Sequence, residues 1–118
     1  RKTVRVEHEG AMEEYRGVLL ADVLAECQVP LGAEVRGSAA VRYLLVTAAD
    51  NYAALLSVPE VDPFFTDEQV LLAETLNGQP VPRGLLQLVV PADKRRRRWV
   101  SHVVRIQGRN PLKTEAQR

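Results

Sequence analysis

Five consecutive cations and one aromatic residue form the segment with the clearest chemical potential, Lys94-Arg95-Arg96-Arg97-Arg98-Trp99. The chain has 16 Lys and Arg residues against 15 Asp and Glu, and without these five cations 11 basic residues remain against 15 acidic ones. The protein is therefore not basic as a whole, because its positive charge is concentrated at one place. Guanidinium groups bind carboxylates and phosphates, so this basic segment is a candidate anion site.

Three interpretations of the basic segment remain open. In the first, it is a solvated hairpin tip that keeps a sheet edge soluble. In the second, it holds the phosphate or pyrophosphate of a pterin or nucleotide, with Arg96 and Arg98 as the binding forks. In the third, it contacts a nucleic-acid backbone, which is disfavoured because the rest of the chain is acidic and no recognition helix is evident. Strand alternation would divide the side chains between two faces, Arg95, Arg97 and Trp99 on one and Arg96, Arg98 and Val100 on the other.

Other residues capable of chemistry give weaker signals. Cys27 is the only cysteine, which excludes an internal disulfide, and its place on an apolar helical stripe predicts a buried small hydrophobe. His8 and His102 are too far apart in sequence for a local metal-ligand motif, and we expect His102 on the apolar face of a strand. Asp50 and Tyr52 lie in a segment that predicts a turn rather than a catalytic acid and phenol, because Asx side chains favour turns. The sequence contains neither a nucleophile–base pair nor a phosphate-binding glycine loop, so no motif in it indicates a hydrolase or a kinase.

Apolar periodicity predicts a β-rich domain. We expect strands at residues 4–8, 12–16, 41–46, 52–58, 70–76, 86–90 and 100–106. A helix is predicted at residues 20–27 and a short one at 59–61, with turns at Glu9-Gly10, 30–32 and Asn77-Gly78. In the last strand, Val100, His102, Val104 and Ile106 would share one face.

The order of these elements lacks the regular βαβ alternation of a doubly wound sheet. The predicted class is therefore α+β and β-rich, with mixed or antiparallel sheets and two or three short helices. At 118 residues and 46% hydrophobic, the chain fits one domain with one core, which we expect at residues 1–107, followed by a polar, frayed tail at 108–118. No apolar run approaches the ~18 residues of a membrane-spanning helix.

Six short motifs occur in an order that resembles a known domain. They are Y-R-G-V-L-L-A-D-V-L at residues 15–24, A-D-N-Y at 49–52, S-V-P at 57–59, L-A-E-T-L-N-G-Q-P-V-P at 72–82, L-Q-L-V-V-P at 86–91, and R-W-V followed by R-I within 98–106. Together they resemble the sulfite-oxidase-like molybdopterin-binding domain over most of the chain. The resemblance implies that domain's β-rich fold, a molybdopterin cofactor and export to the periplasm or the cell exterior. A chain that begins at Arg1 fits signal removal and truncation equally well.

The chain departs from the resembled family where the chemistry lies. In that family a cysteine thiolate ligates molybdenum, whereas Cys27 does not match the position of the ligand motif. A histidine and an arginine that contact the family's cofactor correspond here to Pro82 and Gln87. Arg98 stands at the family's phosphate-facing lysine, so the charge at that position is retained.

The sequence thus gives five candidate cofactor-binding residues and no candidate catalytic or metal-ligating residue: Arg98, Arg96, Gln87, Asp50 and Tyr52. We expect a cofactor-binding, anion-binding or interaction module without molybdenum catalysis. The expected partners are an anionic small molecule, a pterin phosphate or a protein, and nucleic acid is the less favoured one. The first alternative is an active molybdopterin-dependent oxidoreductase whose metal ligand comes from outside this chain. The second is a protein that binds nucleic acid or another polyanion through the basic segment.

Overall fold

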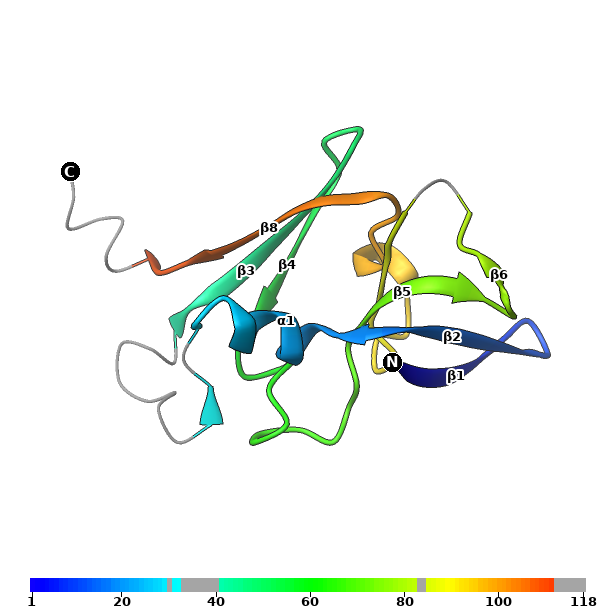
Figure 1. Ribbon diagram of the computed structural model, residues 1–118, viewed down its shortest axis with the longest axis horizontal. Helices are drawn as coiled ribbons and strands as arrows, with labels where there is room; N and C mark the ends of the chain where they lie inside the picture. The colour runs from blue at the N-terminus through cyan, green and yellow to red at the C-terminus, as the bar shows by residue number, and fades with distance from the viewer. Residues whose placement is uncertain (30, 33–40, 83–84, 112–118) are drawn as a thin grey trace.

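The computed structural model describes residues 1–29, 31–32, 41–82 and 85–111, and these residues form two antiparallel sheets and one short α-helix (Figure 1). The larger sheet has the order β1-β2-β5-β6, and β7 also pairs with β5; the smaller sheet has the order β4-β3-β8. The strands are β1 (Lys2–His8), β2 (Ala11–Leu19), β3 (Tyr43–Ala48), β4 (Ala53–Ser57), β5 (Leu71–Leu76), β6 (Gln79–Pro80), β7 (Gln87–Val89) and β8 (Val103–Arg109). The helix α1 spans Leu20–Glu26, and a 3-10 turn, η3, spans Arg96–Arg98. The predicted β-rich α+β class is confirmed, and every strand pair is antiparallel.

One hydrophobic core joins the two sheets and the helix. Its fully buried leucines come from all three layers: Leu20, Leu44, Leu56, Leu71 and Leu88. The sheets are also linked through the backbone, because the Leu88 amide donates to the Val100 carbonyl at 2.8 Å and the Val103 amide donates to the Leu86 carbonyl at 3.0 Å. This link places the chain just after the basic segment against the core.

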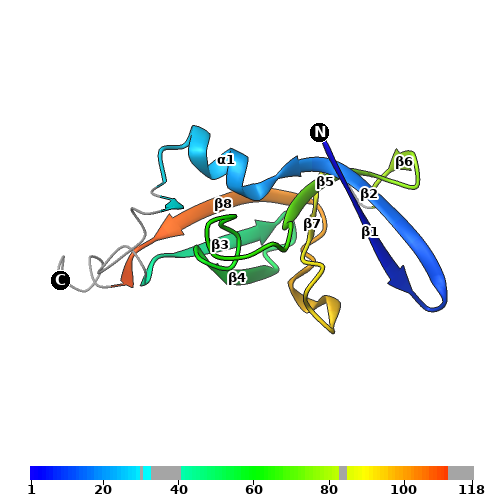
Figure 2. The same ribbon diagram turned by 90° about the horizontal axis from the view of Figure 1, so that it is seen from below.

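Local turn chemistry was predicted correctly at both hairpins. Glu9 and Gly10 have φ of 51° and 81°, and Asn77 and Gly78 have φ of 52° and 83°. These left-handed conformations are those that close tight hairpins with the twist of the flanking strands. The first hairpin is long, and Figure 2 shows β1 and β2 projecting from the body on the same side as the loop that carries η3.

The expectation that Cys27 is buried was wrong. The helix ends at Glu26, and Cys27 is its exposed C-cap residue. Gln28 then takes a left-handed φ of 61°, and the Val29 amide donates back to the Leu24 carbonyl at 3.0 Å. The chain therefore leaves the helix before Cys27 can join the apolar stripe. The turn predicted at residues 30–32 lies partly outside the described residues, because Pro30 is not described.

The face pattern predicted for the last strand was also wrong. His102 has φ of 53°, and the pairing of β3 with β8 shifts register between Thr47 and Ala48. This irregularity reverses the alternation, so Val103 is buried at 8% exposure and Val104 is 59% exposed. The strand continues to Arg109, two residues past the expected end of the domain, and residues 112–118 of the expected tail lie outside the described range.

The short helix predicted at residues 59–61 is absent, and the chain there forms turns. Ser57 and Glu60 do bond reciprocally, as in a helix-capping box: the Ser57 amide donates to Glu60 Oε2 at 2.7 Å and the Glu60 amide donates to Ser57 Oγ at 3.4 Å. Asp62, only 2% exposed, then accepts bonds from the amides of Phe64 at 2.9 Å and Gly32 at 2.7 Å. These bonds and Pro63 end the helical path after one turn. Within the described ranges, no helix has the length and apolarity needed to cross a membrane.

At Gly17, β2 lies against the backbone of β5 with no room for a Cβ, and replacing this glycine with alanine tests the packing there. A Cβ at this position would lie 2.0 Å from the Leu72 carbonyl oxygen, so backbone atoms must move. We expect Gly17→Ala to lower the free energy of unfolding by about 3 kcal/mol, measured by urea titration of Trp99 fluorescence. Gly108→Ala is the matched control, because nothing lies within 4 Å of its added Cβ. Equal stability of the two variants would contradict the close packing described here.

Candidate functional site

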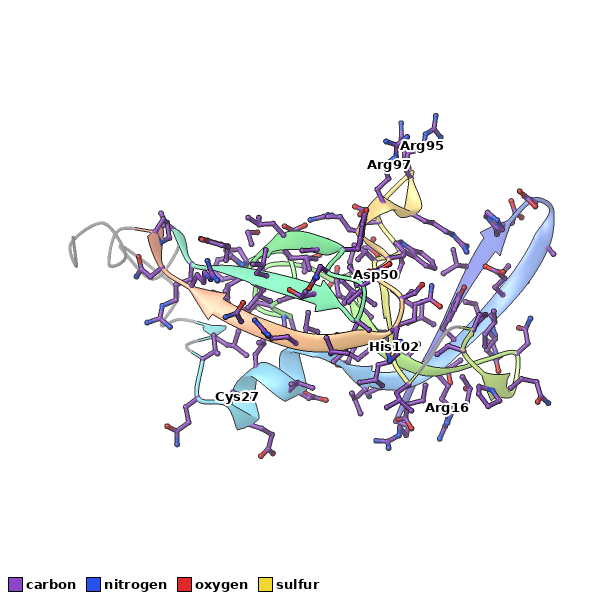
Figure 3. The ribbon with its side chains drawn as sticks, turned by 90° about the horizontal axis from the view of Figure 1, so that it is seen from above. Arg16, Cys27, Asp50, Arg95, Arg97 and His102 are labelled. Atoms are coloured by element: carbon purple, nitrogen blue, oxygen red, sulfur yellow. The ribbon has the colours of Figure 1, made fainter. Side chains whose placement is uncertain are left out.

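The basic segment is a 3-10 turn, so the strand alternation predicted for it was wrong. Such a turn has three residues per revolution, and its consecutive side chains therefore point in three directions. Arg96 points toward β2, Arg98 points toward β4, and Arg97 points into solvent. Figure 3 shows Arg95 and Arg97 projecting from the surface. Lys94, Arg95 and Arg97 are all exposed and form no ion pair with any described residue.

Arg98 cross-links the basic segment to the smaller sheet. Its Nε and Nη2 donate to the two carboxylate oxygens of Asp93 at 2.9 and 2.8 Å, and Nη2 also donates to Glu60 Oε1 at 2.9 Å. Its Nη1 donates to the Leu55 carbonyl of β4 at 3.1 Å. The hydrogen bonds that Arg98 donates to Asp93 and Glu60 raise the pKa of its guanidinium further above its ordinary value, so it stays charged. An added anion at Arg98 would have to displace one of these carboxylates.

The hydrogen bond with Arg98 also changes the pKa of Glu60. Burial raises its pKa, but the hydrogen bonds from Arg98 and from the Ser57 amide outweigh burial, and the net pKa lies below its ordinary value. Glu60 is therefore ionised at neutral pH and completes the carboxylate pair around Arg98.

Arg96 is held on the other side, against the larger sheet. Its guanidinium carbon lies 4.0 Å from the centre of the Trp99 ring, and its Nη2 lies 2.8 Å from Glu13 Oε1. Trp99 is 6% exposed, donates from Nε1 to the Val90 carbonyl at 3.1 Å, and meets Tyr15 edge-on with ring centres 5.5 Å apart. Burial, together with the nearby Glu13 carboxylate, raises the pKa of Tyr15 against the opposing charge of Arg96. Stacking and ion pairing thus fix Arg96 in place.

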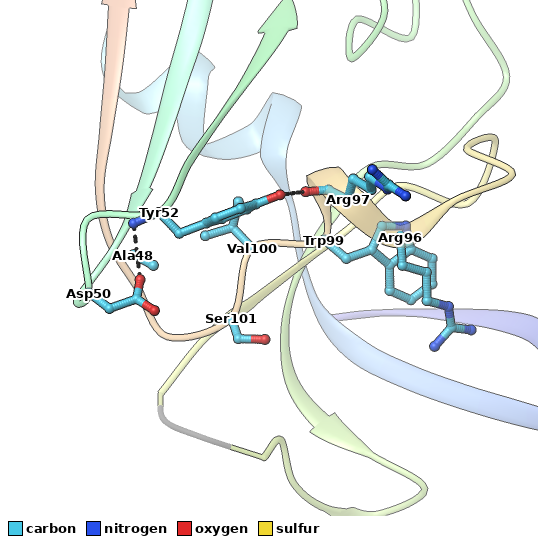
Figure 4. Close-up of a pocket in the computed structure, with 8 residues that line it drawn as sticks. All are labelled: Ala48, Asp50, Tyr52, Arg96, Arg97, Trp99, Val100 and Ser101. Carbon is cyan, nitrogen blue, oxygen red and sulfur yellow. Dashed lines mark hydrogen bonds between the residues drawn. The ribbon is translucent and has the colours of Figure 1, made fainter.

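A cavity of about 250 Å³, which we call the turn groove, lies between η3 and the turn that joins β3 to β4. It is lined by Ala48, Asp50, Tyr52, Arg96, Arg97, Trp99, Val100 and Ser101 (Figure 4). The Tyr52 hydroxyl donates to the Arg97 carbonyl, which bridges the two walls. Asp50 Oδ1 accepts from the Tyr52 amide at 3.0 Å, which confirms the predicted Asx turn, and Asn51 within it takes a left-handed φ of 72°.

The turn groove brings together three of the five candidate residues, namely Arg96, Asp50 and Tyr52. Arg98 is held by its carboxylates outside it, and Gln87 lies on β7, half-buried, where it bridges to Ser101 through the backbone. Two lining residues, Arg97 and Ser101, were not singled out from the sequence. Ser101 also borders a smaller adjoining cavity of about 120 Å³ with Asp50 and His102.

The residues of the turn groove do not fit a thiolate-bound metal. Cys27 is the only cysteine of the chain, and it is exposed at the end of α1, well separated from Arg95 and Arg97 in Figure 3. Within the described residues, no group of three or more His, Cys, Asp or Glu side chains is arranged to hold a metal ion. The chemistry of the groove is that of hydrogen bonding, stacking and charge.

Comparison of the chain with protein-family models and with curated proteins found no match. The resemblance to the sulfite-oxidase-like molybdopterin-binding domain therefore stays a prediction from its motifs.

Replacing Arg98 should cost stability, whereas replacing Arg97 should not. Arg98→Ala leaves Asp93 and Glu60 facing each other without their cation, and we expect a loss of about 2 kcal/mol in the free energy of unfolding. Arg97→Ala removes an equally long but solvated side chain, so its effect should stay within about 0.5 kcal/mol. Equal losses in urea titrations of the two variants would contradict the division of the segment into held and free cations.

Glu60 should also contribute to acid stability. Because its pKa in the folded state is lowered from 4.5, its stabilising effect is present above that pH and is lost as the pH falls through the lower, folded value. We expect the midpoint of thermal unfolding to fall more steeply below about pH 4.5 in the wild type than in Glu60→Gln. If the midpoints of thermal unfolding of the two proteins fell equally steeply below about pH 4.5, the ion pair with Arg98 would not lower this pKa.

Proposed function

We propose that this protein is a binding module, built on a scaffold like the sulfite-oxidase-like molybdopterin-binding domain, that holds a small anionic ligand in the turn groove without molybdenum catalysis. The observation that carries the proposal is the arrangement of charge around this concave site. Arg97 stands at the rim with no ion-pair partner in the described part of the chain, while Arg96 and Arg98 are neutralised by carboxylates of the fold. The cation offered to a ligand is therefore Arg97.

The size and the lining residues of the turn groove indicate which part of a ligand it binds. Its volume of about 250 Å³ lies just below the ~300 Å³ at which pockets for whole drug-sized ligands begin, so we expect it to hold one polar end of a larger molecule. The long side chain of Arg97 can reach a phosphate or carboxylate at the mouth, and the Ser101 hydroxyl offers a second donor. The carboxylate of Asp50 on the opposite wall repels a second anion and accepts bonds from ligand N–H groups. A phosphorylated heterocycle with amino groups matches both features, because its phosphate would meet the donors at the mouth and its amino groups would meet the Asp50 carboxylate.

The same observations argue against the two alternatives. The lining of the groove supplies no sulfur ligand, so active molybdenum chemistry would need a ligand from outside the given sequence. The basic segment offers only three cations without an ion pair to a described residue, Lys94, Arg95 and Arg97, whereas nonspecific nucleic-acid binding needs many phosphate contacts along a surface. A single anionic group on a small molecule is the better match.

Binding of inorganic pyrophosphate tests the proposal. We expect isothermal titration calorimetry to detect binding to the wild type, and Arg97→Glu to weaken it by about tenfold or more, because repulsion replaces the attraction of a free cation at the rim. Arg105→Glu on β8 is the matched control, since it makes the same charge change at another exposed arginine and should retain binding. Absence of pyrophosphate binding, or equal weakening by the two substitutions, would overturn the assignment of the groove.

A further inference from the structure

A second and larger cavity lies on the other side of the basic segment, between it and β1. Its volume is about 390 Å³, and we call it the edge groove. One wall consists of Val6, Glu7 and His8, and the other of Asp93, Lys94, Arg95 and Arg96, with Trp99 also in the lining. In Figure 2, β1 and the loop that carries η3 lie on the same side of the molecule.

The wall formed by β1 is the free edge of the larger sheet. β1 pairs only with β2 in the described structure and is the terminal strand of its sheet. Three consecutive residues of β1 line the groove, although neighbouring side chains of a strand point to opposite faces. Val6 lies opposite Glu13 on the face that meets Arg96, whereas Glu7 belongs to the other face. The groove therefore extends around the backbone edge of β1, which carries unpaired N–H and C=O groups.

The opposite wall carries the cations that the fold leaves uncompensated. Asp93 is occupied by Arg98, and Arg96 is occupied by Glu13 and the Trp99 ring. Lys94 and Arg95 have no acidic partner among the described residues. A sheet edge thus runs opposite two free positive charges, over a partly apolar floor that includes Val6 and Trp99.

The geometry points to a docking site for an extended acidic peptide, which adds as a strand to the edge of β1 and places carboxylates against Lys94 and Arg95. Backbone hydrogen bonds supply affinity in this mode of recognition, and the alternate side chains supply specificity. Charge complementarity selects the acidic peptide over a second copy of this chain, because β1 of a second copy would bring Lys2, which has no ion pair with a described residue, toward the same cations. The site does not depend on the proposed function, since it uses Lys94 and Arg95 rather than Arg97.

The first arm of the test uses the peptide acetyl-Thr-Val-Glu-Val-Glu-Val-Thr-amide and a version with Lys in place of Glu. Trp99 is the only tryptophan and borders the groove, so its fluorescence reports occupancy in the unlabelled protein. We expect the Glu peptide to bind about tenfold or more tightly than the Lys peptide. Equal affinity of the two peptides would overturn the proposal.

The second arm tests strand addition directly with N-methylated peptides. In an added strand, alternate N–H groups face β1 and the others face solvent. Methylating every second amide of one parity should abolish binding, and methylating the other parity should leave it intact. Loss of binding with both sets, or with neither, would contradict pairing with the edge of β1.

The third arm distinguishes peptide binding in the edge groove from self-association of the protein and from ligand binding in the turn groove. The double variant Lys94→Glu/Arg95→Glu should lose the Glu peptide, while the matched control Arg105→Glu/Arg109→Glu should keep it. Arg97→Glu should keep peptide binding, so failure of the pyrophosphate experiment and failure of this one are distinguishable. A concentration-dependent dimer that the Glu peptide cannot dissociate would assign the edge of β1 to a second copy and overturn the proposal.

Discussion

The bidentate contact between Arg98 and Asp93, extended to Glu60, is the interaction on which the arrangement of the functional region depends. It fastens the basic segment to β4 and to the turn that follows it. Five adjacent cations repel one another in any compact conformation. Because Glu13, Asp93 and Glu60 compensate two of them, the segment can wind into a 3-10 turn and still present Lys94, Arg95 and Arg97 to solvent.

This division gives one turn two separate surfaces. Arg97 stands over the turn groove, where the tyrosine, serine and aspartate of the opposite wall offer hydrogen bonds. Lys94 and Arg95 face the edge of β1 across the edge groove. Trp99 lies between the two cavities and is fixed by its bond to Val90 and its contact with Tyr15, so this part of both walls is formed before a ligand arrives. The fixed indole of Trp99 and the free cations therefore belong to the same short segment of the chain.

The sequence predicted those features that local chemistry determines. Strand positions followed from alternation, and the hairpins at Glu9-Gly10 and Asn77-Gly78 followed from residues that tolerate a positive φ. Asp50 formed the Asx turn expected of it. Cys27 and His102 were misplaced because single left-handed residues, Gln28 and His102 itself, interrupted the assumed periodicity. The roles within the basic segment could not be read locally, since the carboxylates that hold Arg96 and Arg98 include Glu13 and Glu60, far away in sequence. The resemblance named Arg98 as a phosphate contact, whereas the fold pairs Arg98 with Asp93 and Glu60 and leaves Lys94, Arg95 and Arg97 without an ion pair to any described residue.

Side-chain NMR of the arginine Nε–H groups is the most direct test of this division between held and free cations. The account predicts that Arg98, whose Nε donates to Asp93, shows slow hydrogen exchange and a rigid 15N relaxation profile. Arg95 and Arg97 should show fast exchange and averaged, mobile signals. Uniform mobility across these arginines, or rigid signals for Arg97 with a mobile Arg98, would contradict it.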